Sequence, residues 1–270
     1  MTAPNAAAFL ETMKKSVRYH LLDLIRGLSI LSMTLYHAMW DIVNLFGVEA
    51  AWYKGTLGHI WQQSICQTFI VLSGFCWSIG SHKLRRGAQV FISGLLVTAA
   101  TAIFMPKAIV LFGILTFLGS AMLILIPLDR YLKLLPPSAG AAVCLLLFAI
   151  ISYIDLPSII IGPKALSAYI GFPAPDFFST DYFPLIPWIF LYMTGYFLQR
   201  LIMKENSESA FSSNDSLCID RPQHHLMQKS LCRPLEFIGR CSLPIYLMHQ
   251  IVIYAVLTVF FAYVLPLLPL

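Results

Sequence analysis

One stretch of the chain decides its fold: Leu21-Leu-Asp-Leu-Ile-Arg-Gly-Leu-Ser-Ile-Leu-Ser-Met-Thr-Leu-Tyr-His37-Ala-Met-Trp-Asp41. It is long and apolar enough to cross a bilayer as a helix, yet it carries Asp23, Arg26, His37 and Asp41. An ionisable side chain at the centre of a membrane helix costs about 2.5–3.5 kcal/mol, so such groups usually face a protein interior or a water-filled cavity. The stretch therefore indicates a membrane helix that lines a functional site.

The spacing of these four residues places them on one side of the helix. Arg26 and His37 are eleven residues apart, so at about 100° per residue they fall within roughly 20° of each other. Asp23 and Asp41 each lie within roughly 60° of Arg26 by the same arithmetic. A rise of about 1.5 Å per residue separates Arg26 from His37 by about 16 Å along the axis. We therefore predict a polar stripe along a helix whose other faces meet lipid or apolar neighbours.

The composition indicates an all-α, polytopic membrane helix bundle. Of the 270 residues, 58% are hydrophobic and 11% are charged, whereas a soluble domain carries about 25% charged residues. The apolar runs have the length of membrane helices and lack the alternation of a transmembrane barrel. We expect about 7–8 transmembrane helices, with seven runs near residues 21–40, 60–80, 88–105, 109–127, 139–154, 183–199 and 236–262.

The sequence allows more than one structure for the last run and for one additional apolar segment. The last run is long and is expected to break near Pro244 or to split towards its end. A short apolar piece at residues 157–172, interrupted by Gly162-Pro163 and Gly171, is either re-entrant or an additional crossing. The number of helices therefore depends on how these two segments fold.

The distribution of basic residues predicts a cytoplasmic N-terminus. Alternate loops between the seven runs carry most of the cations, and cytoplasmic loops are enriched in Lys and Arg. The loops assigned to the cytoplasm hold Lys14, Lys15, Arg18, Lys83, Arg85, Arg86, Arg130, Lys133, Arg200, Lys204, Arg221, Lys229 and Arg233, and the opposite loops hold Lys54, Lys107 and Lys164. This pattern accounts for the net charge of +5 without a nucleic-acid partner.

We divide the chain into a cytoplasmic segment at residues 1–20 and one transmembrane domain at residues 21–265. A serine-rich stretch predicts a flexible cytoplasmic loop within residues 203–232. The first apolar run has too many ionisable groups for a cleavable signal peptide. Cys66, Cys76 and Cys144 lie in apolar runs, where we interpret them as small apolar core residues.

His37 is the leading candidate for chemistry. With the N-terminus in the cytoplasm, Arg26 lies near the inner face and His37 near the outer face. A neutral imidazole acts as a general base or a nucleophile near neutral pH. Asp41 follows four residues later on the same helix face and is placed to orient it. The alternative is that the two residues only hold helices together.

A second polar stripe occurs in the next run. His59, Gln63 and Gln67 are spaced by four residues, and buried amides need hydrogen-bond partners. Gln63 and Gln67 are candidates for contact with a polar substrate, and interhelical hydrogen bonding is the alternative. His59 is the second candidate for the catalytic base.

Two later segments carry further polar candidates. Asp181-Tyr182 opens the sixth run, where an acidic residue and following prolines suit a helix start. Tyr246, His249 and Gln250 share one face of the last run at spacings of three and four residues. We assign all five residues to substrate binding, against the alternative that they cap or join helices.

These segments together resemble a known group of enzymes. Leu22-Asp-Leu-Ile-Arg-Gly27 with its terminal His37, Asp181-Tyr-Phe-Pro-Leu-Ile-Pro-Trp188 with Gly195-Tyr196, and Ile238-Gly-Arg-Cys-Ser-Leu-Pro-Ile-Tyr-Leu-Met-His-Gln250 are similar to motifs of the transmembrane acyltransferase superfamily. The ending of the first segment, with His37 and Asp41, resembles short bacterial relatives of the heparan-alpha-glucosaminide N-acetyltransferase catalytic domain, which are related to membrane O-acyltransferases. The lysosomal enzyme's active histidine follows its first catalytic-domain helix, which makes His59 the positional counterpart here, whereas the O-acyltransferase pattern favours His37.

The resemblance implies an acyltransferase in a bacterial inner membrane. Its donor is acetyl-coenzyme A or another cytosolic acyl-coenzyme A, without a metal, and its acceptor is an amine or hydroxyl of a glycan or a lipid. Guanidinium groups suit phosphates, so the candidate donor-binding residues are Arg26, Arg85, Arg86 and Arg240, together with Asp23 as the partner of Arg26. Direct transfer and an acyl-histidine intermediate both remain open, as does a homodimer.

Two other functions are compatible with the same residues. Buried Asp, His and Arg chains also build proton relays, so a proton-coupled transporter is the main alternative. A non-catalytic membrane scaffold is the second. The sequence has neither a Walker A motif nor a dinucleotide-binding glycine pattern nor a His-Glu-x-x-His zinc motif.

Overall fold

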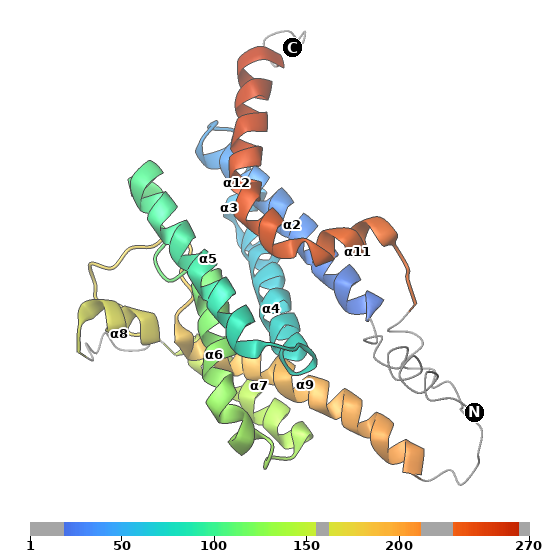
Figure 1. Cartoon of the computed structure of the whole chain (residues 1–270). Coiled ribbons are helices and arrows are strands. Elements are labelled where there is room, and N and C mark those ends of the chain that lie inside the picture. The colour runs from blue at the N-terminus through green and yellow to red at the C-terminus, as the bar shows by residue number, and fades with distance from the viewer. Residues whose placement is uncertain (1–18, 155–161, 212–228, 265–270) are drawn as a thin grey trace.

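The computed structural model describes residues 19–154, 162–211 and 229–264, with the side chains of residues 204–211 and 264 left out. This part of the chain is helical and contains no strand, which confirms the all-α prediction (Figure 1). The helices are α2 (His20–Asn44), α3 (Ala51–Lys54), α4 (Thr56–Ile79), α5 (Lys83–Phe104), α6 (Ile114–Leu132), α7 (Pro137–Tyr153), α8 (Lys164–Ile170), α9 (Leu185–Phe211), α11 (Arg233–Arg240) and α12 (Ser242–Val259), which ends in a π-helical turn (Phe260–Val264).

Four helical segments in the described part are long and apolar enough to cross a membrane. They are Lys83–Phe104, Ile114–Leu132, Leu185–Met203 and Ser242–Tyr263, and Pro137–Tyr153 is a shorter apolar helix. Helices α2 and α4, which carry the two predicted polar stripes, have 25 and 24 residues, which is also long enough to span a bilayer. The seven long helices coincide with the seven predicted runs, whereas the number of crossings and the orientation of the N-terminus stay predictions.

The structure bears on three segments that the sequence left open or assigned differently. The last run breaks at Cys241, between α11 and α12, which agrees with the predicted break near Pro244. Pro244 itself lies in the first turn of α12, where its missing N–H has no intrahelical partner to lose. Helix α8 has 7 residues and a length of about 10 Å, which by itself is shorter than a membrane crossing; residues 155–161 of this segment lie outside the described part. Helix α9 continues to Phe211, into the predicted loop; residues 1–18 and 212–228 lie outside the described residues.

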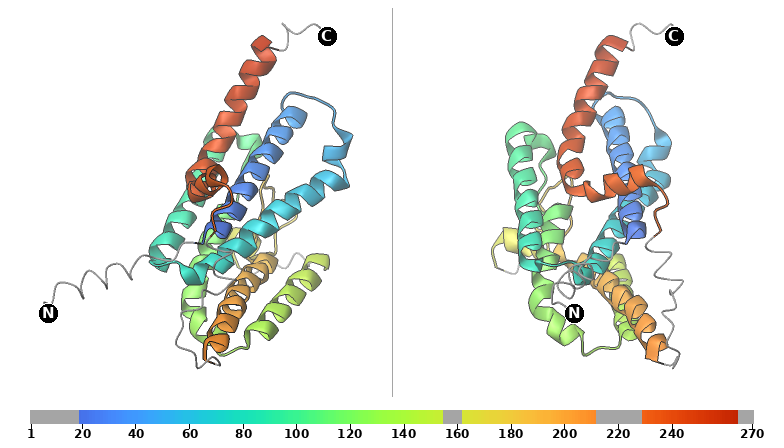
Figure 2. Two further views of the ribbon diagram at one scale, coloured as in Figure 1. Left: turned by 90° about the vertical axis from the view of Figure 1, so that its right-hand side faces the viewer. Right: turned by 45° about the vertical axis from the view of Figure 1, so that its right-hand side comes forward.

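The helices pack in three main groups. Helix α4 runs beside α9, and α7 covers another side of α9. Helices α5 and α6 form an adjacent pair, while α2 packs against both α11 and α12. Figures 1 and 2 show α11 lying across the start of α2 and α12 rising beside α2 towards the C-terminus. Helix α2 also contacts α4, and Asp41 of its polar stripe is fully buried.

Glycines allow the closest helix contacts. A Cβ on Gly74 in α4 would lie 2.0 Å from the carbonyl oxygen of Tyr192 in α9, and one on Gly195 in α9 would lie 2.1 Å from the carbonyl oxygen of Val71. Gly27 in α2 and Gly239 in α11 approach each other's helix in the same way. Small residues at such contacts are typical of membrane helix packing, because they let backbones approach.

Substituting Gly74 tests the contact between α4 and α9. We expect Gly74→Ala to destabilise the protein by about 1–3 kcal/mol, because the added methyl group must push the two backbones apart. Thermal unfolding in detergent measures the effect. Ser64→Ala, on an exposed part of the same helix, serves as the control, and an equal loss in both variants would contradict the expectation.

Glu236 ties the start of α11 to the start of α2. Its side chain is buried and accepts hydrogen bonds from His20 Nδ1 at 2.7 Å, Ser230 Oγ at 2.9 Å, and the backbone N–H groups of Leu231 and Cys232 at 3.0 and 3.3 Å. The hydrogen bond from His20 and these other donors lower the pKa of Glu236 to about 2. The carboxylate thus holds α11 across α2 in its ionised form.

The low pKa of Glu236 predicts how stability depends on pH. A carboxyl group whose pKa is lower in the folded state stabilises the protein above its unfolded pKa, and this stabilisation is lost as the pH falls through the folded value. We expect the loss between an unfolded pKa of 4.5 and a folded pKa of about 2. Glu236→Gln should lower the unfolding temperature at neutral pH and reduce its pH dependence in this window. An unchanged profile would contradict the assignment.

Candidate active site

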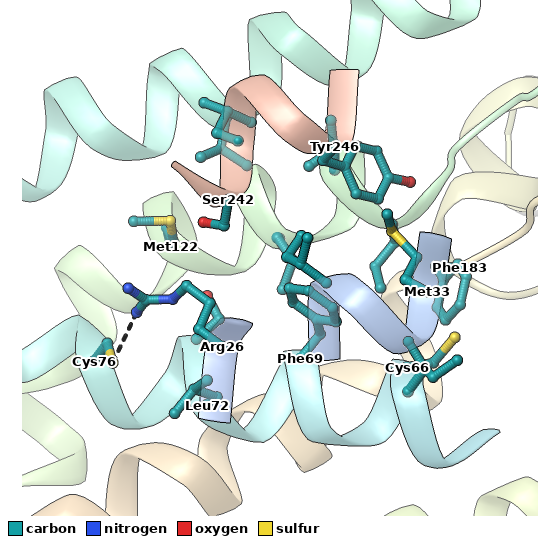
Figure 3. Close-up of a pocket in the computed structure, with 18 of the residues that line it drawn as sticks. Arg26, Met33, Cys66, Phe69, Leu72, Cys76, Met122, Phe183, Ser242 and Tyr246 are labelled. Carbon is teal, nitrogen blue, oxygen red and sulfur yellow. Dashed lines mark hydrogen bonds between the residues drawn. The ribbon is translucent and has the colours of Figure 1, made fainter. Parts of the chain in front are cut away.

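A cavity of about 340 Å³ lies between α2, α4, α5, α6 and α12. The loop before α9 closes one side of it with Asp181 and Phe183. The side chains that line it come from five helices and from that loop, so residues that are far apart in the sequence meet around one space (Figure 3). Helix α2 lines the cavity with Arg26, Ile30, Met33 and His37.

The end of the cavity near the start of α2 is cationic. Arg26 donates a hydrogen bond to Cys76 Sγ at 3.2 Å and forms an ion pair with Asp23 at 3.5 Å. Figure 3 shows Arg26 beside Cys76, with Ser242 and Met122 on the same side. Arg86 also lines the cavity; its guanidinium packs against Gly80, where a Cβ would lie 1.4 Å from Nη1.

Arg26 has a carboxylate partner in Asp23, whereas Arg86 has none among the described residues. Its charge is therefore not balanced by a carboxylate in this part of the chain. Together with Arg26, it provides two guanidinium groups, which bind phosphates through paired N–H donors.

The middle of the cavity is apolar. Apolar side chains of the lining include Ile30, Phe69, Val90 and Leu118, from α2, α4, α5 and α6. Figure 3 shows Phe69 between the Arg26 end and the Tyr246 end. Such walls suit a thin, uncharged portion of a ligand, because they offer dispersion contacts and few hydrogen-bond partners.

The opposite end gathers groups that can handle protons. His37, Asp181 and Tyr246 line it, and Figure 3 shows Met33, Phe183 and Cys66 around Tyr246. Asp181 Oδ2 accepts a hydrogen bond from the backbone N–H of Ile114 at 3.2 Å, at the N-terminus of α6. Burial raises the pKa of Asp181 to about 6, although this hydrogen bond opposes the shift.

Three more predicted residues lie beside His37 and do not line the cavity. The ring of His249 contacts that of His37, with centroids 4.8 Å apart. Asp41 is fully buried and accepts a hydrogen bond from Gln250 Nε2 at 2.7 Å. Within the described residues, Asp41 makes no hydrogen bond to His37. The sequence interpretation paired Asp41 with His37, whereas the structure pairs it with a residue from the other end of the chain.

Several predicted site residues lie away from the cavity. His59, Arg85 and Arg240 are exposed, and Gln63 and Gln67 are half-buried on α4 without lining it. Tyr182 donates to the carbonyl oxygen of Ala168 at 2.5 Å, so it braces α8. Of the two candidate bases, only His37 lines the cavity described here. The cavity brings together these predicted residues: Arg26, His37, Arg86, Asp181 and Tyr246.

Sequence reasoning missed one wall of the cavity. Cys76 and Cys144 lie in the apolar core and Cys66 packs against it, as predicted, but Cys66 and Cys76 also line the cavity and Cys76 accepts a hydrogen bond from Arg26. Phe69 and Ser73 complete this wall on α4. The spacing 66, 69, 73, 76 follows one face of a helix, and this pattern was available as a signal. The described residues contain no group of three or more His, Cys, Asp or Glu side chains placed to hold a metal.

Comparison with known proteins identifies the family. The family model described as heparan-alpha-glucosaminide N-acetyltransferase, catalytic, matches residues 18–251. Comparison with curated proteins and with solved structures gave no match. The matched range includes all three motif segments and every residue that lines the cavity, and it gives no support to the transporter alternative. The chain therefore belongs to the heparan-alpha-glucosaminide N-acetyltransferase catalytic-domain family, and we identify it as an integral membrane acetyltransferase.

Proposed function

We propose that this acetyltransferase takes an acetyl group from cytosolic acetyl-coenzyme A and transfers it to an amine or hydroxyl of a glycan or lipid at the opposite membrane face. The cavity is the observation that carries this proposal. It connects two guanidinium groups at one end with His37 at the other, and the axial distance from Arg26 to His37 is about 16 Å.

The two ends suit the two parts of the donor. The phosphates of coenzyme A would meet Arg26 and Arg86, and the long pantetheine arm would pass between the apolar walls formed by residues such as Phe69 and Val90. The thioester would then reach the end that holds His37. Asp23 limits the rotation of Arg26 through its ion pair, which orients one guanidinium before the donor arrives.

The chemistry at the far end needs a base and an acceptor site. In direct transfer, the acceptor nitrogen or oxygen attacks the thioester carbonyl carbon, His37 takes the acceptor proton, and coenzyme A leaves as a thiolate that is then protonated. In the alternative, His37 is acetylated first and the acceptor attacks that intermediate. Asp181 and Tyr246 line this end and would position the acceptor in either route.

The orientation follows from the basic residues. With the N-terminus in the cytoplasm, the Arg26 end opens towards the cytosolic donor and the His37 end towards the outer face of a bacterial inner membrane. Alternate loops with more Lys and Arg are expected in the cytoplasm, and Arg85, Arg130 and Arg200 lie near ends of helices assigned to that side. Transfer across the membrane would then need no movement of the donor through the bilayer.

Donor binding can be tested with neighbouring arginines. We expect acetyl-coenzyme A to raise the unfolding temperature in detergent, since a ligand at 100 times its Kd stabilises by about 2.7 kcal/mol. Arg86→Ala should weaken binding at least about tenfold, because a charge-assisted contact to phosphate is lost. Arg85→Ala is the matched control, since Arg85 is exposed and outside the cavity. No shift at millimolar acetyl-coenzyme A, or equal weakening in both variants, would argue against the donor site.

The catalytic base can be tested with the two histidines. We expect His37→Ala to lower the rate of acetyl transfer by about 100-fold or more, the size of a typical general-base contribution. His59→Ala should leave the rate within about threefold of the wild type, because a surface substitution away from the site has little effect. The measurement is release of coenzyme A with an amino sugar or a hydroxylated sugar as acceptor. Full activity in His37→Ala would remove this residue from the mechanism.

A further inference from the structure

A cluster of buried acceptor atoms lies behind His37. Asp41 Oδ2, Gln250 Oε1 and His249 Nε2 are all buried and have no hydrogen-bond partner among the described residues. The three side chains come from α2 and α12, which pack side by side. A buried polar atom without a partner destabilises the folded protein, so three in one place require a physical reason.

The neighbouring hydrogen bonds fix what each atom can do. Gln250 donates from Nε2 to Asp41 Oδ1, so its Oε1 is an acceptor. His249 Nδ1 is bonded to the backbone carbonyl oxygen of Tyr246, and a carbonyl only accepts, so Nδ1 carries the hydrogen and Nε2 is an acceptor in the neutral ring. With an ionised Asp41, the cluster would contain three unpaired acceptors, and the second N–H of Gln250 would be the one uncommitted donor of these three side chains.

The groups around Asp41 supply no cation. On α2, His37 precedes it by one turn; from α12, it faces Gln250 and, beyond it, His249. From α3, Tyr53 is the nearest titratable group, and its hydroxyl donates to the carbonyl oxygen of Tyr36. No Lys or Arg of the described residues pairs with Asp41. A buried carboxylate without a counter-ion is strongly disfavoured and instead takes up a proton.

We propose that Asp41 is a neutral carboxylic acid that pairs with the Gln250 amide through two hydrogen bonds. One bond is the observed one from Gln250 Nε2 to Asp41 Oδ1. The other would run from a proton on Asp41 Oδ2 to Gln250 Oε1, so a single proton satisfies two of the three orphan acceptors. The third, His249 Nε2, remains for a hydrogen donor on the neighbouring ring of His37 or on a bound ligand.

In this arrangement Asp41 is a positioning residue that acts through α12. The acid–amide pair would hold the outer part of α2 against α12 and so keep His37 beside His249, whose ring lies 4.8 Å away between centroids. The carboxyl group would not stabilise a positive charge on His37 directly. The inference deepens the proposed active site and relies on the proposed transfer reaction for only one of its readouts.

Asn is the informative substitution because it resembles the protonated acid. Its amide can accept from Gln250 Nε2 and donate to Gln250 Oε1, so it reproduces both hydrogen bonds without a charge. We expect Asp41→Asn to keep the acetyl transfer rate within about threefold of the wild type and to keep the unfolding temperature. Asp41→Ala and Gln250→Ala should each lower kcat at least about tenfold, with the KM for acetyl-coenzyme A unchanged. Gln62→Ala, at a half-buried amide outside the cluster and the cavity, is the control.

Two measurements on the intact protein do not depend on catalysis. The infrared spectrum at neutral pH should contain the carbonyl stretch of a protonated carboxylic acid that Asp41→Asn removes and Gln250→Ala shifts. The unfolding temperature of Asp41→Asn should be higher than that of Asp41→Ala. If the wild type transferred no acetyl group, the proposed function would fail while these two readouts still decided the protonation of Asp41. Absence of the acid band, or an Asp41→Asn variant as impaired as Asp41→Ala, would overturn the proposal.

Discussion

The cost of placing charged side chains in hydrocarbon shapes this structure. Helix α2 carries Asp23, Arg26, His37 and Asp41. A charged side chain at the centre of a membrane helix costs about 2.5–3.5 kcal/mol when it meets lipid. The helix therefore has to be covered by protein along its polar stripe, and α4, α11 and α12 provide that cover. A cavity forms where the cover is incomplete, between Arg26 and His37.

A close backbone contact brings together the first and the last sequence motifs of the family. Gly27 of the first motif approaches the carbonyl oxygen of Leu235 in α11, and Gly239 of the last motif approaches the carbonyl oxygen of Asp23. Because each glycine has no side chain, the backbone of the other helix can approach it closely, and the contact needs both glycines. The contact sets where α12 begins, and thereby which of its side chains reach His37.

The sequence allowed much of the fold and one part of the site to be predicted. Helical periodicity put Arg26 and His37 on one face, and both line the cavity. Periodicity within one helix cannot tell which face another helix covers, so Gln63 and Gln67 were assigned to substrate binding while Phe69, Ser73 and Cys76 form the α4 wall instead. The charge on Arg85 and Arg86 is the same, and only tertiary packing turns Arg86 into the cavity and leaves Arg85 exposed.

The environment of Asp41 shows why spacing alone misjudges a polar pair. A separation of four residues brings two side chains near each other on a helix surface, but a buried carboxyl group bonds to the donor that is best placed. Gln250, 209 residues further along the chain, occupies that position at 2.7 Å. An amide offers a donor and an acceptor together, so it can satisfy a neutral acid completely. A neutral imidazole with its donor already committed to a carbonyl, as in His249, offers only an acceptor. Pairing Asp41 with the Gln250 amide therefore leaves the fewest buried polar atoms without a hydrogen bond, although His37 is closer in sequence.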